Sequence, residues 1–213
     1  MVSGVSIIKT GFERLVQVVV CALMCVVMAA CGGGSPTEPG GNTGGGGGGG
    51  NTTCNGVAVG PLGCAKGMMT GTINGATFNG GVPTGASTYT PVAAVPALGI
   101  PALDFIVIQG TSADLTSLTI TARAKVGVGA LGAGVLDPDT RNVTINVAAL
   151  ATRANGVGTG QWNTNVTAGT GTVTLTSVST TAAVGSYSFT MEAQPGSGAT
   201  GTRTVTGTFN VTF

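Results

Sequence analysis

The stretch TRTVTGTFNVTF, Thr202–Phe213, decides the fold of this chain. Val205, Phe209 and Val211 alternate there with threonine and asparagine, so apolar side chains fall on one face of an extended strand and polar side chains on the other. A period of two is typical of an antiparallel strand that has one face in the core and one face in water. The stretch therefore predicts a half-buried antiparallel strand.

The same alternation recurs through the residues that precede this stretch. It runs through four further segments: Leu118–Ala124, Val143–Val147, Thr172–Val178 and Tyr187–Ala193. LDFIVIQ, Leu103–Gln109, is an apolar run and predicts a central strand buried on both faces. Asn74-Gly75 predicts a two-residue hairpin turn, because both residue types tolerate positive φ. No helical periodicity follows residue 54. We expect residues 54–213 to form a single all-β domain of about eight or nine strands, an antiparallel β-sandwich or, alternatively, an up-and-down β-barrel.

The composition agrees with strands whose outer faces carry hydroxyls instead of charges. From Cys54 onward the chain has 29 threonines against 11 charged residues, and the full chain has no histidine and a net charge of +1. This balance excludes an electrostatic nucleic-acid binder, which needs a clustered basic surface. The missing histidine removes most acid–base chemistry near neutral pH. Arg123, Lys125 and Arg203 are the candidates for protecting exposed strand edges against association.

The N-terminal residues carry a targeting signal. Lys9 and Arg14 precede the apolar run Leu15–Ala30, which predicts a secretory signal peptide over residues 1–30. Met28-Ala29-Ala30-Cys31 resembles the lipobox of bacterial lipoproteins, and this resemblance implies a mature chain whose Cys31 carries acyl chains such as palmitate. The alternative is an ordinary cleaved signal peptide. Gly32 stands where an inner-membrane retention signal would place Asp, so we expect the anchor in the outer membrane of the cell envelope.

The segment after Cys31 predicts a tether, and the cysteines beyond it predict one disulfide. Residues 31–53 are Gly-rich and, after Cys31, have no apolar side chain other than proline, which is typical of a flexible linker. Cys54 and Cys64 are then the two cysteines left in the domain, and an exported domain favours a disulfide between them. The alternative is a metal or redox pair, although C-x-x-C spacing and a third ligand are missing.

Three segments carry a family resemblance. MTGTINGATFNG (Met69–Gly80), GTVTLTSVSTTAAVGSYSFTMEA (Gly171–Ala193) and VTGTFNVTF (Val205–Phe213) are similar to the bacterial lipoprotein domain called domain of unknown function 6252. The resemblance covers about residues 67–213, while the Pro- and Ala-rich stretch Val82–Pro101 departs from it. It implies export, lipidation and a β-domain, and it transfers no site residue.

Two motifs have chemical interpretations that we weigh against structural ones. Gly127–Gly132 matches the dinucleotide fingerprint G-x-G-x-x-G, but strand signals flank it where the fingerprint needs a following helix, so we expect a hairpin loop. Asp137-Pro138-Asp139-Thr140 favours a type I turn. The alternatives for Asp137 and Asp139 are a calcium site or the carboxylate pair of a hydrolase. We assign no catalytic residue, no metal ligand and no cofactor.

Trp162, the single tryptophan, lies among amides in GQWNTN, which we interpret as a loop. It is either a core or lid aromatic or a platform on which a sugar stacks. The sequence thus predicts a non-enzymatic, lipid-anchored binding or structural module whose partners are the membrane and a protein or glycan. The alternative is a carrier of a small apolar ligand or glycan that uses a β-cavity or Trp162.

Overall fold

The computed structural model describes residues 52–94, 102–132, 146–154, 157–165 and 170–213, all within one compact unit, Gly47–Phe213. The predicted signal peptide, Cys31 and nearly all of the tether lie outside these ranges, as do Val143, Ile145, Asp137 and Asp139. Among the residues described, no helix has the length and apolarity needed to cross a bilayer.

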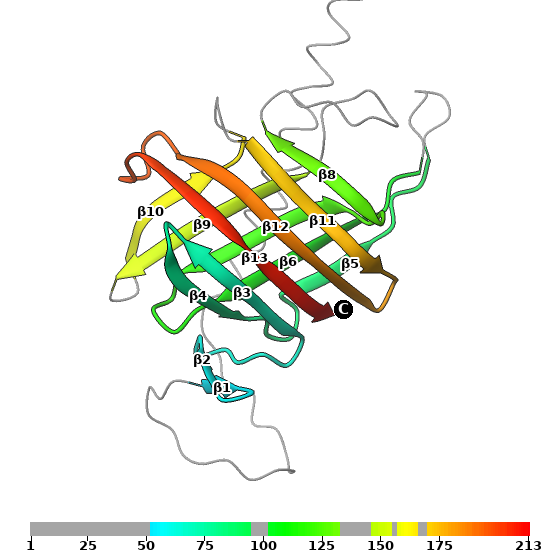
Figure 1. Cartoon of the computed structure of the whole chain (residues 1–213), viewed down its shortest axis with the longest axis horizontal. Helices are drawn as coiled ribbons and strands as arrows, with labels where there is room; N and C mark the ends of the chain where they lie inside the picture. The colour runs from blue at the N-terminus through cyan, green and yellow to red at the C-terminus, as the bar shows by residue number, and fades with distance from the viewer. Residues whose placement is uncertain (1–51, 95–101, 133–145, 155–156, 166–169) are drawn as a thin grey trace, which may run out of the picture. The chain divides into compact units, whose positions relative to one another are not determined.

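The described residues form thirteen strands, and every pairing between them is antiparallel (Figure 1). The strands are β1 (Thr52–Cys54), β2 (Val57–Val59), β3 (Gly67–Ile73), β4 (Ala76–Gly81), β5 (Ser87–Thr90), β6 (Phe105–Thr111), β7 (Ser117–Arg123), β8 (Gly127–Gly132), β9 (Val147–Ala154), β10 (Val157–Asn163), β11 (Thr170–Val178), β12 (Ala182–Ala193) and β13 (Thr202–Thr212). The all-β antiparallel prediction is confirmed. The count exceeds the expected eight or nine partly because β1, β2 and β5 are too short, at three or four residues, to show an alternation.

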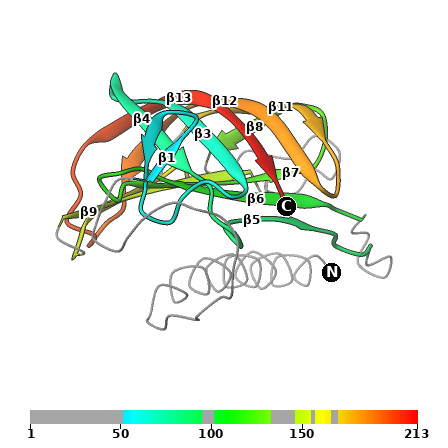
Figure 2. The same ribbon diagram turned by 90° about the horizontal axis from the view of Figure 1, so that it is seen from below.

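Eight of these strands close a ring in the order β3, β4, β6, β7, β9, β10, β12, β13. At two places in the ring, which we call seams, neighbouring strands share very few residue pairs. Strands β4 and β6 share only the pair Gly81↔Thr111, and β10 and β12 share only Trp162↔Ala193 and Asn163↔Glu192. The ring is therefore flattened into two layers, whose strands cross in Figure 1 and which lie one above the other in Figure 2. This arrangement combines the strand order of the barrel alternative with the layers of a sandwich.

The core lies between the two layers and follows the predicted alternation. In β6 and β7 every second residue is buried, and in β13 the buried side chains are Val205, Phe209 and Val211. The largest fully buried side chains are Met69, Ile106, Ile108, Leu118, Ile120, Leu131, Leu150, Met191, Val59, Val82, Val173 and Val205. Position 207 also faces the core, and a glycine stands there because a side chain would not fit. A Cβ would lie 2.1 Å from the Thr70 carbonyl oxygen and 2.5 Å from the Tyr187 hydroxyl.

The predicted hairpin turn is confirmed. Asn74 and Gly75 connect β3 to β4 with φ values of 50° and 81°, as a type I′ turn requires. The Asn74 side chain also accepts a 2.8 Å hydrogen bond from the Thr204 amide, and the Asn74 amide donates one of 2.8 Å to the Thr204 carbonyl. The turn is thus fastened to β13 next to it.

Two local predictions are wrong. The run Leu103–Gln109 was expected to be buried on both faces, but β6 buries Ile106, Ile108 and Gly110 and leaves Phe105, Val107 and Gln109 half-buried, because no second described layer covers its outer face. The segment Gly127–Gly132 was expected to be a loop, but it forms β8. It pairs with β11 from Gly127↔Leu175 to Gly132↔Thr170. Pairing with a threonine-rich neighbour outweighs the weak strand propensity of glycine.

The expected edge protection is also wrong for two of its three residues. Arg203 lies in β13, between β3 and β12, and Arg123 lies in β7, between β6 and β9. Both strands are internal to the sheet, so neither residue covers an edge. Lys125 lies between β7 and β8.

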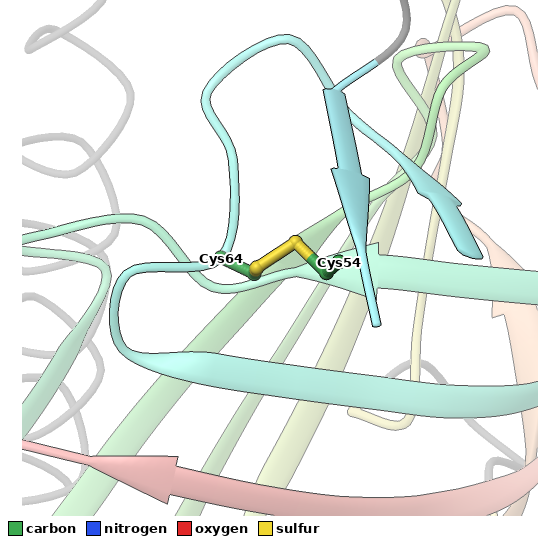
Figure 3. Close-up of a disulfide and its surroundings, with 2 residues drawn as sticks. All are labelled: Cys54 and Cys64. Carbon is green, nitrogen blue, oxygen red and sulfur yellow. A yellow bond between two sulfur atoms is a disulfide. The ribbon is translucent and has the colours of Figure 1, made fainter. Parts of the chain in front are cut away.

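The predicted disulfide is present. Cys54, at the end of β1, is bonded to Cys64 ahead of β3, with 6.3 Å between their Cα atoms (Figure 3). The segment that it closes packs onto the domain through Val59, which is fully buried, and through a 2.9 Å hydrogen bond from the Gly60 amide to the Thr111 carbonyl. The disulfide therefore fixes the β1–β2 hairpin next to the β4–β6 seam.

Candidate functional site

The β4–β6 seam opens into a cavity. Beyond the single pair Gly81↔Thr111, strand β4 continues toward Ala76 while the chain after β6 turns at residues 112–116, so the two backbones stop pairing. A cavity of about 340 Å³ lies there, which we call the end cavity. Its apolar lining includes Ile73, Phe78 and Leu150, and its polar lining includes Thr77, Asn79, Asp114, Thr152 and Arg203. Its volume falls at the lower end of the range of small-ligand sites, and its lining is more polar than is usual for them.

Asp114 supplies the negative charge of the end cavity. Its carboxylate accepts hydrogen bonds from the Ser112 hydroxyl, from the Thr116 amide at 3.1 Å and from the Thr116 hydroxyl at 3.1 Å. Partial burial acts to raise the pKa of Asp114, but these hydrogen bonds outweigh it and hold that pKa below its ordinary value. The carboxylate is therefore ionised at neutral pH and held in one orientation.

Arg203 supplies the positive charge. It shares the inward parity of Val205 along β13, and its guanidinium carbon lies 4.4 Å from the centre of the Trp162 ring. One guanidinium N–H donates to the Thr202 carbonyl at 3.2 Å, and within the described ranges no carboxylate lies in ion-pair range of Arg203. A guanidinium has five N–H donors, so most of them remain for a ligand.

Trp162 lies in β10, where the sequence suggested a loop, and it is only 4% exposed. Its neighbours Gln161 and Asn163 project to the other face of the strand, which explains why an amide-rich segment can contain a core aromatic. The ring packs against Gly160, at which a Cβ would lie 2.6 Å from the indole. Its Nε1 points to the Thr200 carbonyl at 3.4 Å, and Arg203 covers one face of the ring. As placed, the indole is a core residue and not an open stacking surface.

Among the described residues, the remaining carboxylates are Asp104 and Glu192. Asp137 and Asp139 lie outside the described residues. Asp104 accepts a 2.5 Å hydrogen bond from the Tyr89 hydroxyl, and this bond is the main reason why the pKa of Tyr89 is raised. Within the described ranges no group of three or more His, Cys, Asp and Glu side chains could hold a metal ion.

A second concave surface lies on the outer face of β3, β13, β12 and β11. Cross-strand register aligns its hydroxyls in rows, with Thr72 and Thr206 3.1 Å apart and Thr70 and Thr208 3.3 Å apart. The hollow there has a volume of about 360 Å³, and no charged side chain lines it. It is a less specific candidate than the end cavity, because it offers hydroxyls without a charge to orient a ligand.

Sequence reasoning missed Arg203 and Asp114 as site residues. The signal for Arg203 was its two-residue spacing from Val205, which places it on the core side of its strand. The signal for Asp114 was the Ser-x-Asp-x-Thr spacing of a side-chain-capped turn.

No family model, curated protein or solved structure matches this chain. The resemblance to domain of unknown function 6252 and to a lipobox thus stays a prediction.

Proposed function

We propose that this chain is a lipid-anchored module of the bacterial cell envelope that binds a small ligand or glycan in its end cavity and performs no catalysis. The observation that carries the binding role is the end cavity itself, where the charges of Asp114 and Arg203 lie around an apolar lining. Fixed polar groups above apolar side chains give a site both orientation and affinity.

The chemistry of the cavity supports binding over catalysis. Asp114 is held as an acceptor with its pKa below the ordinary value, which makes it a poor general acid or base near neutral pH. The guanidinium of Arg203 offers hydrogen-bond donors and no acceptor. With no histidine in the chain, neither residue has a partner suited to proton transfer.

The proposed anchor is Cys31, with the Gly-rich residues 32–53 as a tether between the lipid and the domain. The Cys54–Cys64 disulfide supports an oxidising compartment, which the envelope of a bacterium provides. The partners are then the membrane, through the acyl chains, and a ligand or glycan of the envelope, in an outer-membrane location.

The anchor is tested by metabolic labelling with an alkyne palmitate and by membrane fractionation. We expect label and membrane association in the natural chain and in a Cys25→Ala control, and neither in Cys31→Ala. Equal membrane association of Cys31→Ala would refute the anchor.

The binding role is tested by screening the full chain in detergent against envelope glycans and amphiphiles. Ala113 lines the cavity and is exposed, so Ala113→Phe should fill the cavity without disturbing the core. We expect this variant to lose the ligand, while Ala93→Phe, at an exposed position outside the cavity, retains it. If no ligand responds to Ala113→Phe, the domain is not a binding module of this kind.

A further inference from the structure

The geometry points to an acidic sugar, a uronic acid unit of a glycan, as the ligand of the end cavity, with its carboxylate held by Arg203. This inference rests on the proposed binding function and adds the chemical class of the ligand. It follows from the orientation of one cation, from the presence of one anion, and from the uncharged groups between them.

The position and the unused hydrogen-bond donors of the Arg203 guanidinium favour the binding of an anion. The guanidinium carbon lies 4.4 Å from the ring centre of the buried Trp162, which restricts the position of the group, and among the described residues only the Thr202 carbonyl accepts a hydrogen bond from it. A restricted guanidinium loses little entropy when it binds a planar carboxylate through two parallel hydrogen bonds. Partial burial also leaves this cation less hydrated than one at an open surface, which strengthens its attraction for an anion. The first requirement of the site is therefore a carboxylate-like group.

Asp114 limits how much negative charge the ligand can carry. Its carboxylate lines the same cavity and is ionised at neutral pH, so the two fixed charges of the cavity cancel. A ligand with a single negative charge gains the contact with Arg203 at a modest cost from Asp114, whereas inorganic phosphate, with about one and a half charges at neutral pH, is repelled more strongly by Asp114. A carboxylate has about four acceptor sites, of which Ser112 and Thr116 occupy three. The remaining site suits a hydroxyl donor on the ligand.

The uncharged lining suits the rest of a sugar ring. Thr77 and Asn79 of β4 lie at the rim of the cavity, on the outer face of the sheet, and their hydroxyl and amide groups both donate and accept hydrogen bonds. Ile73, which is half-buried, offers apolar surface to the C–H face of a ring, and the buried Phe78 and Leu150 lie beneath it. A ligand that combines one carboxylate, several hydroxyls and an apolar ring face matches all three groups, and a uronic acid is such a ligand.

The test is titration of the full chain in detergent with oligomers of galacturonic acid, with neutral galactose oligomers of the same length and with inorganic phosphate. Trp162 is the single tryptophan of the chain and touches Arg203, so its fluorescence reports on the site, and calorimetry gives the dissociation constants. We expect the acidic oligomers to bind and the neutral oligomers and phosphate to bind at least about tenfold more weakly.

Variants at Arg203 separate charge from geometry. Arg203→Gln should weaken the binding of galacturonate oligomers by about tenfold to a hundredfold, as expected for the loss of a charge-assisted hydrogen bond. Arg203→Lys keeps the charge but not the bidentate fork, and it should weaken binding to a lesser degree. Arg153→Gln is the matched control, because it removes one exposed cation from β9 and should leave binding unchanged. Asp114→Asn should raise the affinity for phosphate.

The inference is overturned if neutral oligomers bind as tightly as acidic ones, if phosphate binds more tightly than galacturonate, or if Arg153→Gln and Arg203→Gln have equal effects. Binding of a neutral ligand that Ala113→Phe abolishes would overturn the acidic sugar and leave the proposed binding function in place. A complete absence of ligands sensitive to Ala113→Phe would overturn both. Selectivity of the natural chain decides the inference even if Arg203→Gln fails to fold.

Discussion

The side-chain amide of Asn146 forms hydrogen bonds to the backbone of both β7 and β8. Replacing Asn146 by alanine gives the sharpest test of the fold. Its side-chain oxygen accepts a 2.9 Å hydrogen bond from the Arg123 amide at the end of β7, and its side-chain nitrogen donates a 3.1 Å hydrogen bond to the Ala130 carbonyl in β8. Strands β7 and β8 belong to different layers, and Asn146 is only 5% exposed. One buried side chain thus connects the end of one layer to the last strand of the other.

The expected cost of Asn146→Ala follows from these two bonds. An unsatisfied buried backbone group costs about 1–3 kcal/mol. Arg123 is half-buried, so its amide should incur a cost within this range, whereas Ala130 is exposed and its carbonyl can be rehydrated. We therefore expect a loss of about 1–3 kcal/mol in the free energy of unfolding. Asn210→Ala, at an exposed residue of β13, should change it by less than about 0.5 kcal/mol.

Replacing Gly129 by alanine perturbs the same Asn146 side chain from the other side. A Cβ at Gly129 would lie 2.6 Å from the side-chain nitrogen of Asn146 and 3.5 Å from Val173. Gly129→Ala should therefore destabilise the natural chain by displacing the Asn146 amide. In the Asn146→Ala background the space is vacant, and the same substitution should cost at least about 1 kcal/mol less.

The assay is urea unfolding, followed by Trp162 fluorescence and by circular dichroism, on the four chains of this double-mutant cycle. Hydrogen exchange of the β8 amides distinguishes local opening of β8 from global unfolding. The reasoning is refuted if Asn146→Ala changes neither the free energy of unfolding nor the protection of β8, or if the two substitutions are additive.

Four further outcomes follow from the structure. Replacing both Cys54 and Cys64 by Ser should lower the free energy of unfolding by about 2–3 kcal/mol, the loop-entropy value for two residues ten apart in sequence, as measured by urea titration. Because the folded-state pKa of Asp114 is lowered, its contribution is present above the unfolded-state pKa of about 4 and is lost as the pH falls through the folded-state value; Asp114→Asn should flatten the acid limb of a stability–pH curve, and an unchanged limb would contradict this. Gly207→Ala should shift β13 or Tyr187 and lower the melting temperature by several degrees, since the nearest backbone oxygen would lie 2.1 Å from the new Cβ. Arg203→Met should leave the melting temperature unchanged or higher while weakening ligand binding at least as much as Arg203→Gln does, and a loss of stability comparable to that of a core deletion would count against a binding role for Arg203.

The strands were predictable from the sequence, whereas the site was not. A period of two is a local property, so Val205, Phe209 and Val211 identified both the strand and its buried face. Asn74-Gly75 identified a turn for the same reason, because the backbone conformation depends on these two residues alone. The end cavity forms because β4 and β6 pair at Gly81 and Thr111 and at no other position. This pairing joins residues thirty apart in the sequence, and no local pattern encodes it.

Trp162 and Arg203 show why such long-range relations matter for function. Trp162 was assigned to a loop because amides surround it in sequence, and Arg203 to an edge because it is charged. In the structure the pairs Trp162↔Ala193 and Met191↔Arg203 bring β10 and β13 to adjoining positions on either side of β12, and the cation stacks on the indole. A charge that faces the core side of an internal strand, with no carboxylate partner among the described residues, loses hydration, and an apolar side chain of similar length would cover Trp162 without that loss. Stability therefore gives little reason for an arginine at this position beyond its contact with the Trp162 ring, whereas the anionic ligand that we propose would give one.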